Sequence, residues 1–136
     1  MLQRMSIGEF LGVLVKTVSE RTGLACEVGA FDGKSPFYAI EVLPSEPANT
    51  KTMFVERYKV WIHCISEPVV PYSHAPVLRL VQGLEEALTR DIPLSEPYQL
   101  NNQVHEGVQT LKKDESGEGH AVVAYSFEVC YGFKCK

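Results

Sequence analysis

The stretch Met53-Phe-Val-Glu-Arg-Tyr-Lys-Val-Trp-Ile-His-Cys-Ile-Ser66 decides the fold of this chain. Its side chains alternate between two faces. One face takes Tyr58, Val60, Ile62 and Cys64, and the other takes Arg57, Lys59, Trp61, His63 and Ile65. Such alternation among β-branched and aromatic residues is typical of a half-buried strand. At about 3.3 Å per residue the stretch extends about 46 Å. We therefore expect a strand that crosses the whole sheet and overhangs it.

The N-terminal part of the sequence predicts a helix over residues 6–22. Ser6 and Glu9 have the spacing of a capping box, in which each side chain satisfies a free backbone N–H group near the helix start. An apolar stripe follows at helical spacing, made of Phe10, Leu11, Leu14 and Val18. Gly23 stands where a left-handed residue ends a helix.

A second amphipathic helix is expected to begin near Ser73 and to stop before Ile92. Ser73 can cap this helix, and Pro76 fits its first turn because the missing N–H is not needed there. The predicted buried stripe contains Val77, Leu80 or Val81, Leu84 and Leu88. With one apolar stripe each, the two helices can cover one face of a sheet.

Further strands are predicted over residues 26–31, 37–43, 107–113 and 120–133, with a weaker candidate over 98–104. Residues 37–43 should pair antiparallel with the long strand, because the loop between them is too short for a parallel crossover. The sequence therefore predicts an α+β fold with a mainly antiparallel sheet of about five strands, in the order α-β-β-β-α-β-β, and two helices packed on one face. We expect residues 1–136 to form a single domain.

The charge balance argues against a nucleic-acid partner. Thirteen basic and seventeen acidic residues give a net charge of −4, which is the wrong sign for neutralising phosphates. No apolar run approaches the length of about 18 residues that spans a bilayer, and no apolar leader is visible at the N-terminus. We therefore expect no membrane partner, and we expect the four cysteines, at positions 26, 64, 130 and 135, to be reduced thiols.

No catalytic, metal or cofactor site is predicted. His63 and Cys64 are adjacent on a strand and point to opposite faces, so they cannot form a nucleophile and base pair. Cys64 shares its face with apolar residues and is interpreted as a small core residue. Cys130 and Cys135 lack the second ligand pair that a zinc site needs. We therefore expect the protein not to be an enzyme.

The face of the long strand that carries Trp61, His63 and Ile65 has no obvious cover within the chain. An exposed apolar patch of this kind usually marks a partner surface. Trp61 is either an interface anchor or a core residue under a loop of the same chain. The loop of residues 44–52 is long and polar, and we expect it to fold only against a neighbouring subunit or another partner protein. The candidate interface residues are Trp61, His63, Ile65, Asn49, Lys51 and Met53.

Several blocks of the sequence are similar to a family of small proteins from the structural gene clusters of tailed phages and prophages of Gram-positive bacteria. The blocks are Lys34-Ser-Pro-Phe-Tyr38, Pro47-Ala-Asn-Thr-Lys-Thr-Met53, Val60-Trp-Ile-His63 with Glu67-Pro68, Leu84-Glu-Glu-Ala-Leu-Thr89 and Val129-Cys-Tyr-Gly-Phe-Lys-Cys-Lys136. The similarity covers essentially the whole chain, and the order of elements resembles that of tail-terminator or tail-to-head joining proteins. The family offers no catalytic residues.

The resemblance implies a structural role in the virion. The expected protein is a homo-oligomeric ring, a hexamer by analogy with the symmetry of tail tubes, at the end of the tail. Its expected partners are the tail tube protein and a head-completion protein. A second hypothesis remains open, that the chain is a small protein- or ligand-binding module acting on a host or phage partner. The identity of the neighbouring genes would distinguish the two.

Overall fold

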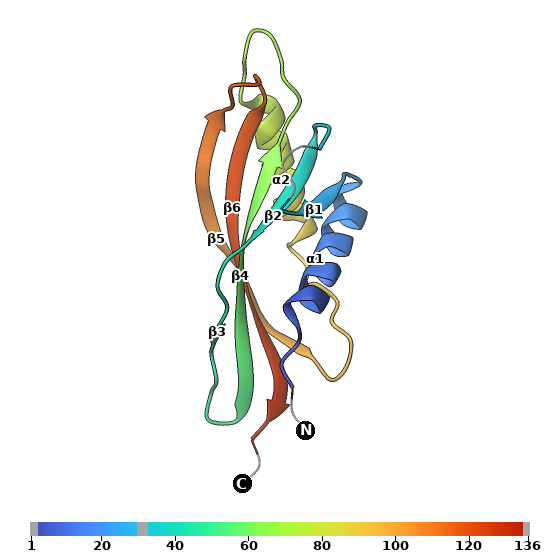
Figure 1. Ribbon diagram of the computed structural model, residues 1–136, viewed down its shortest axis with the longest axis vertical. Coiled ribbons are helices and arrows are strands. Elements are labelled where there is room, and N and C mark those ends of the chain that lie inside the picture. Colours follow the sequence, from blue (N-terminus) through green and yellow to red (C-terminus); the bar gives the residue numbers. More distant parts are fainter. Residues whose placement is uncertain (1–2, 30–32, 135–136) are drawn as a thin grey trace.

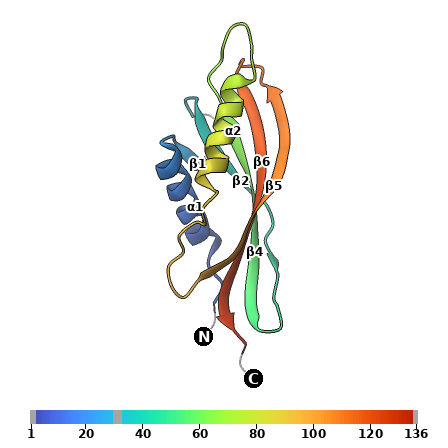
Figure 2. The same ribbon diagram turned by 180° about the vertical axis from the view of Figure 1, so that it is seen from behind.

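The computed structural model describes residues 3–29 and 33–134. The elements in chain order are α1 (Ile7–Thr22), β1 (Cys26–Val28), β2 (Phe37–Val42), β3 (Glu46–Pro47), β4 (Met53–Ile65), α2 (Ala75–Ala87), β5 (Gln99–Lys113) and β6 (Gly119–Phe133). They build one sheet with the strand order β1-β2-β4-β6-β5, and β3 pairs with β4 beside this path. Both helices lie on one side of the sheet (Figures 1 and 2). The α+β class with two helices on one face is confirmed.

Strand β4 is the centre of the sheet, as the alternation of its residues predicts. It pairs antiparallel with β2 from Phe37 opposite Ile65 to Val42 opposite Val60. On its other side it pairs antiparallel with β6 over its whole length, ending with Met53 opposite Phe133. Because β2 borders only the upper half of β4, the lower half overhangs the main sheet (Figure 1).

The first helix begins and ends where its sequence signals lie. The Ser6 hydroxyl oxygen accepts a hydrogen bond from the backbone N–H of Glu9 at 3.1 Å. Gly23 adopts the left-handed conformation with φ 76°, and its N–H donates to the carbonyl of Ser19. This conformation strains any residue with a Cβ, so a glycine is favoured at this position.

The start of α2 differs from the expectation in one detail. His74 is the N-cap residue and makes no side-chain capping bond. Ser73 still contributes, because its hydroxyl oxygen accepts a hydrogen bond from the N–H of Ala75 at 3.1 Å. The C-terminal end of α2 is held by α1, since the Arg21 guanidinium donates to the carbonyl of Ala87 at 2.8 Å and to that of Arg90 at 2.9 Å. The bond to Ala87 satisfies a carbonyl that the end of α2 leaves free.

The two short strands predicted over 98–104 and 107–113 are one strand, β5. Its pairing with β6 shifts register at three places, between Leu100 and Asn102, between His105 and Gly107, and between Val108 and Thr110. Each irregularity inverts the in–out pattern of the side chains, so the sequence shows no continuous alternation. The prediction of separate strands was wrong for this reason.

The sheet has six strands and is mixed. β1 pairs parallel with β2, with Cys26 opposite Tyr38, whereas the other pairs are antiparallel. β3 was expected to be loop, and it pairs with β4 through Glu46 opposite Arg57 and Pro47 opposite Glu56. Two-residue strands leave no periodicity for a sequence pattern to detect. The predicted strand over 26–31 ends at Val28, and residues 30–32 lie outside the described part.

The main core lies between the helices and the sheet. Phe10 of α1 stacks on Tyr58 at 4.6 Å between ring centroids and meets Phe127 edge-on at 5.2 Å. The Tyr38 hydroxyl is buried and donates to the carbonyl of Leu80 in α2 at 2.8 Å. Cys64 is fully buried in this core, as predicted. Each fully buried large side chain contributes about 1.5–3 kcal/mol to the free energy of folding.

Candidate functional site

The predicted interface residues of β4 lie on the outer face of the sheet, which is the face turned away from the helices. Trp61 is half-buried there, between Glu41 of β2 and Ala124 of β6. Ile65 is only 3% exposed and packs in a small second core with Phe37 and Ala39. The expected exposure of Ile65 is therefore wrong, because Phe37 and Ala39 of β2 pack against its side chain. Trp61 keeps an accessible surface.

His63 belongs to a chain of hydrogen bonds across the outer face. Its Nε2 lies 2.8 Å from a carboxylate oxygen of Glu41, and its Nδ1 lies 2.7 Å from Nε2 of His120. The Nδ1 of His120 lies 2.9 Å from a carboxylate oxygen of Asp114. The chain thus connects β2, β4, β6 and the turn between β5 and β6. His63 and His120 are largely buried, with side chains 11% and 14% exposed.

The geometry of this row of hydrogen bonds sets the number of protons that it needs. Each of the three contacts needs one proton, and ionised carboxylates supply none. Two neutral imidazoles carry only two ring protons, so three contacts require one imidazole to be cationic. Burial lowers the pKa of His63, although its bond to Glu41 acts in the opposite direction and the charge of His120 lowers the pKa further. With both rings neutral, two of the three contacts can therefore be hydrogen bonds at one time.

The lower end of the molecule forms a projection that we call the arm. It consists of β3, the loop of residues 48–52, Met53–Arg57 of β4 and Glu128–Phe133 of β6 (Figure 1). β5 runs beside only the upper part of this projection, because its pairing with β6 begins at Gln99 opposite Cys130. The end of the arm is therefore a ribbon of two paired strands, and such a ribbon buries little apolar surface by itself.

The loop at the tip of the arm is ordered within the single chain. The Asn49 side-chain oxygen accepts from the N–H of Val55 at 2.8 Å, and the Thr50 hydroxyl accepts from the N–H of Met53 at 3.0 Å. Asn49 is thus a structural residue of the turn. The expectation that residues 44–52 fold only against a neighbour is wrong, because hydrogen bonds from side chains within the loop hold its backbone in place.

An ion-pair cluster ties the three strands of the arm together on the outer face. Arg57 of β4 donates to Glu46 of β3 at 2.8 Å and, through two nitrogens, to Glu128 of β6 at 2.7 and 2.9 Å. The Arg57 guanidinium, helped by Lys59, holds the pKa of Glu46 below its usual value. A bidentate guanidinium fixes geometry better than an ammonium does. The cluster therefore holds the arm in one register.

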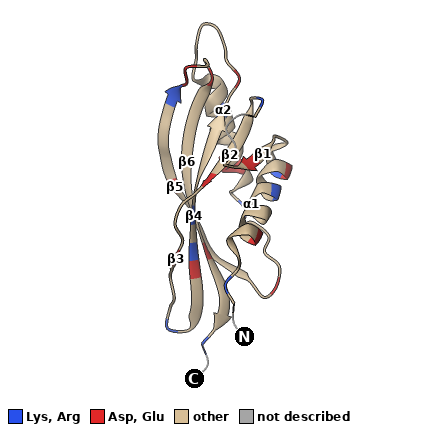
Figure 3. Ribbon diagram, in the orientation of Figure 1, with Lys and Arg blue, Asp and Glu red and all other residues tan. Residues whose placement is uncertain are grey.

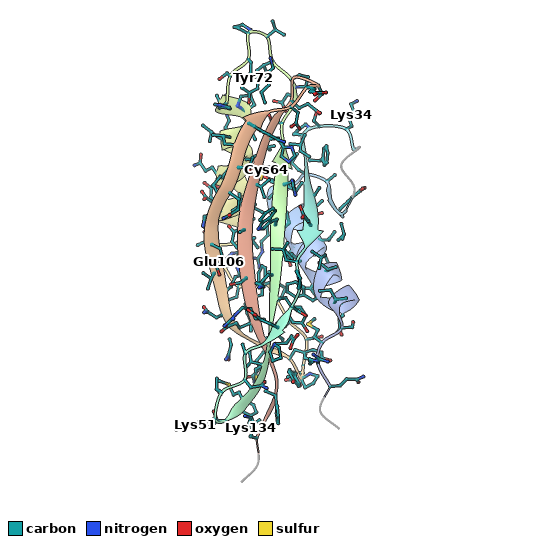
Figure 4. The ribbon with its side chains drawn as sticks, turned by 60° about the vertical axis from the view of Figure 1, so that its left-hand side comes forward. Lys34, Lys51, Cys64, Tyr72, Glu106 and Lys134 are labelled. Atoms are coloured by element: carbon teal, nitrogen blue, oxygen red, sulfur yellow. The ribbon has the colours of Figure 1, made fainter. Side chains whose placement is uncertain are left out.

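The tip of the arm is aromatic and basic. Phe133 is 58% exposed, and the rings of Phe54 and Tyr131 lie 5.9 Å apart. Lys134 Nζ lies 5.4 Å from the centre of the Phe54 ring. Figure 4 shows Lys51 and Lys134 together at this end, far from Tyr72 at the other end. Exposed aromatic rings beside cations are typical of protein-binding surfaces.

Strand β5 is a second accessible feature, and no functional role was predicted for it. It is the terminal strand of the sheet, so one row of its backbone N–H and C=O groups has no partner strand among the described residues. Most of its side chains are exposed. Two lysines mark its C-terminal end in Figure 3, Lys112 and Lys113. Long edge strands are sites at which a second chain can add.

The thiols of the described residues are placed as core groups. Cys26, Cys64 and Cys130 are free and buried. Burial raises the pKa of Cys26 to about 12 and that of Cys64 still further, which keeps both thiols protonated and unreactive. Cys135 lies outside the described residues. Over residues 3–29 and 33–134, no group of three or more His, Cys, Asp or Glu side chains could hold a metal ion.

Residues 1–136, the entire chain, match a phage tail terminator family described as "Putative tail termination protein". The chain belongs to this family. The tail-terminator resemblance of the sequence blocks is therefore confirmed, and the protein has a structural role in the phage tail and is located in the virion. No curated protein sequence matches the chain. Among its described helices, none is long and apolar enough to cross a membrane.

A solved structure shares the fold of this tail-terminator family member. It is described as "Virion of native gene transfer agent (GTA) particle", and the superposition has a TM-score of 0.56 at 15% sequence identity. The match covers 83% of this chain and 84% of that chain. At such low identity the likeness concerns the fold.

Proposed function

We propose that this protein ends the phage tail by closing into a ring on the tail tube, where it also meets a head-completion protein. The observation that carries the proposal is the family match over the whole chain. A hexamer is proposed because tail tubes commonly have sixfold symmetry. The proposed partners are therefore further copies of this chain, the tube protein and the head-completion protein.

The arm is proposed as the surface that docks on the tube. The arm carries the exposed ring of Phe133 at the same end as the lysines Lys51 and Lys134. The Glu46–Arg57–Glu128 cluster makes it rigid before any partner binds. A preorganised surface loses less conformational entropy on binding than a flexible one does. Met53, which lies at the same end, completes this proposed surface.

The edge of β5 and the outer face around Trp61 are proposed as contacts between subunits. A ring needs two different surfaces on each subunit, because only a heterologous contact can repeat around an axis. β5 offers free backbone groups along one edge of the sheet. Trp61 offers a large, partly accessible ring on the outer face, and tryptophan is enriched among residues that dominate binding energy.

Co-sedimentation with purified tail tubes tests the docking surface. The variant Phe133→Ala removes an exposed ring from the arm, and we expect it to lower the affinity for tubes about tenfold or more. The matched control is Val70→Ala, because Val70 is 98% exposed in the loop between β4 and α2, at the opposite end of the molecule. We expect the control to bind like the unmodified protein.

The outcomes separate the proposal from its alternative. Loss of binding in Phe133→Ala alone supports the arm as the docking surface. Loss in Val70→Ala alone would place the tube contact at the other end and overturn the docking surface. If the unmodified protein fails to bind tubes, the ring proposal is contradicted and a small binding module with another partner becomes the better explanation.

A further inference from the structure

Glu56 is a carboxylate at a core position of the sheet. It follows the helix-facing alternation of β4, whose other members are Tyr58, Val60, Ile62 and Cys64. Its strand partners are Val129 on β6 and Pro47 on β3. The residue is only 3% exposed. A charged residue at a position that the pattern reserves for apolar side chains is an informative exception.

The Glu56 carboxylate lacks the partners that a buried charge needs. Its Oε1 is buried and has no hydrogen-bond partner among residues 3–29 and 33–134. The Tyr58 hydroxyl is nearby but donates to the carbonyl of Met5 instead. The described cation beside it is Arg4, whose Nη1 lies 3.6 Å from Oε1 on a side chain that is 61% exposed. Buried carboxylates are normally paired and hydrogen-bonded, because desolvation strongly disfavours the charge.

A cavity of about 400 Å³ opens beside this carboxylate. It is lined by the N-terminal segment of residues 3–7, by Ser45 and by Glu56 and Tyr58. Met5 and Tyr58 contribute apolar walls, whereas Ser6 and Ser45 contribute hydroxyl groups. The volume falls within the range of small-ligand sites. A pocket that combines apolar and hydroxyl groups with one buried anionic group can take an aliphatic stem that ends in a cation.

We propose that this pocket binds an arginine or lysine side chain presented by another protein chain. The incoming cation would form the hydrogen bonds that Glu56 lacks and would replace Arg4 as its counter-ion. A divalent metal is a poorer fit, because such ions take several oxygen ligands and the described pocket offers one carboxylate. An anionic ligand is repelled by Glu56. The site does not depend on the tail role, so either proposal can fail without the other.

Two model compounds of equal shape test the pocket on the isolated protein. The n-butylguanidinium ion carries the charge of an arginine side chain, and n-butylurea is its neutral analogue. In a titration followed by amide NMR shifts, we expect the cation to give saturable shifts confined to residues 3–7, Ser45 and 56–58. We expect n-butylurea to give at least tenfold weaker binding, because it cannot compensate a buried charge.

Variants assign the binding to Glu56. Glu56→Gln should weaken n-butylguanidinium binding at least tenfold, whereas the matched control Glu27→Gln, in exposed β1, should leave it unchanged. Arg4→Gln should tighten binding severalfold, because it removes the competing cation. Equal shifts with n-butylurea, or unchanged binding in Glu56→Gln, would overturn the proposal. Should Glu56→Gln not fold, weaker binding in Arg4→Gln would overturn it as well.

Discussion

His63 Nδ1 and His120 Nε2 face each other at 2.7 Å across the paired strands β4 and β6. This contact holds with one proton between the two rings. If neither of the two facing nitrogens carries a proton, two lone pairs repel each other. If both carry a proton, two N–H groups repel each other. Glu41 and Asp114 bind the far sides of the rings and fix their orientation. The outer face is therefore held by a contact that depends on protonation.

Acidification should destabilise the protein through His63. Burial is the largest influence on the pKa of His63 and lowers it below 6.5. The charges of His120 and Lys112 also lower this pKa, whereas the hydrogen bond to Glu41 raises it. The unfolded chain therefore takes up a proton before the folded chain does. The contribution of His63 to stability is fully present above about pH 6.5 and is lost as the pH falls toward the folded pKa.

Denaturant unfolding at pH 7.5 and pH 5.5 measures this dependence. We expect the stability lost between the two pH values to be smaller in His63→Gln than in the unmodified protein. The control is His74→Gln, because His74 is exposed and lies outside the four-residue chain. An equal loss in His63→Gln and the unmodified protein would contradict the assignment.

Replacing Glu56 with a neutral residue should stabilise the isolated protein. Removal of a buried charge that lacks hydrogen bonds is neutral or favourable, by about 1–2 kcal/mol here. Glu56→Gln and Glu56→Met are compared with Glu27→Gln, for which a change within about 0.5 kcal/mol is expected. A loss of stability in both Glu56 variants, measured by chemical denaturation, would show that the carboxylate supports the fold.

Two glycines should respond to alanine in opposite directions. A Cβ at Gly119 would lie 2.6 Å from the Ser66 Oγ and 2.9 Å from the Val77 Cβ, so Gly119→Ala should destabilise by about 1–3 kcal/mol through overpacking. A Cβ at Gly12 in α1 meets nothing within 4 Å. Gly12→Ala should stabilise by about 0.5–1 kcal/mol through helix propensity. Thermal unfolding of both variants checks the pair, and equal signs would contradict the packing described around Gly119.

Trp61 should matter more for association than for folding. Its ring is half-buried on the outer face, so Trp61→Ala should lower the monomer stability by less than about 2 kcal/mol. The next residue, Ile62, is fully buried on the opposite face, and Ile62→Ala should lower it by about 2–5 kcal/mol. Self-association is compared in the same variants. A stability loss in Trp61→Ala as large as in Ile62→Ala would make Trp61 a core residue.

The predictable part of the fold is the part with regular periodicity. Tyr58 to Ile65 alternates without interruption, and the structure places the strand there with the predicted facing. Ser6 and Gly23 act through local backbone geometry, so they were readable from the sequence. β5 was not, because its three register shifts interrupt the alternation of its residues.

The candidate site was harder to predict because it depends on long-range register. His63 and His120 are 57 positions apart in the chain, and no local pattern shows that two strands bring their rings together. The burial of Ile65 depends on long-range pairing of the same kind, because Ile65 packs against Phe37 and Ala39 of β2. Glu56 did carry a local signal, because it continues the alternation that places Tyr58 in the core.

The length of the tails made without this protein tests the central proposal most directly. Particles from a phage that lacks the gene are imaged by negative-stain electron microscopy, and a plasmid copy of the gene serves as the control. If the protein terminates the tail, the deletion should give tails of widely varying length that are not joined to heads, and the plasmid copy should restore uniform joined tails. Uniform tails joined to heads in the deletion would contradict the account.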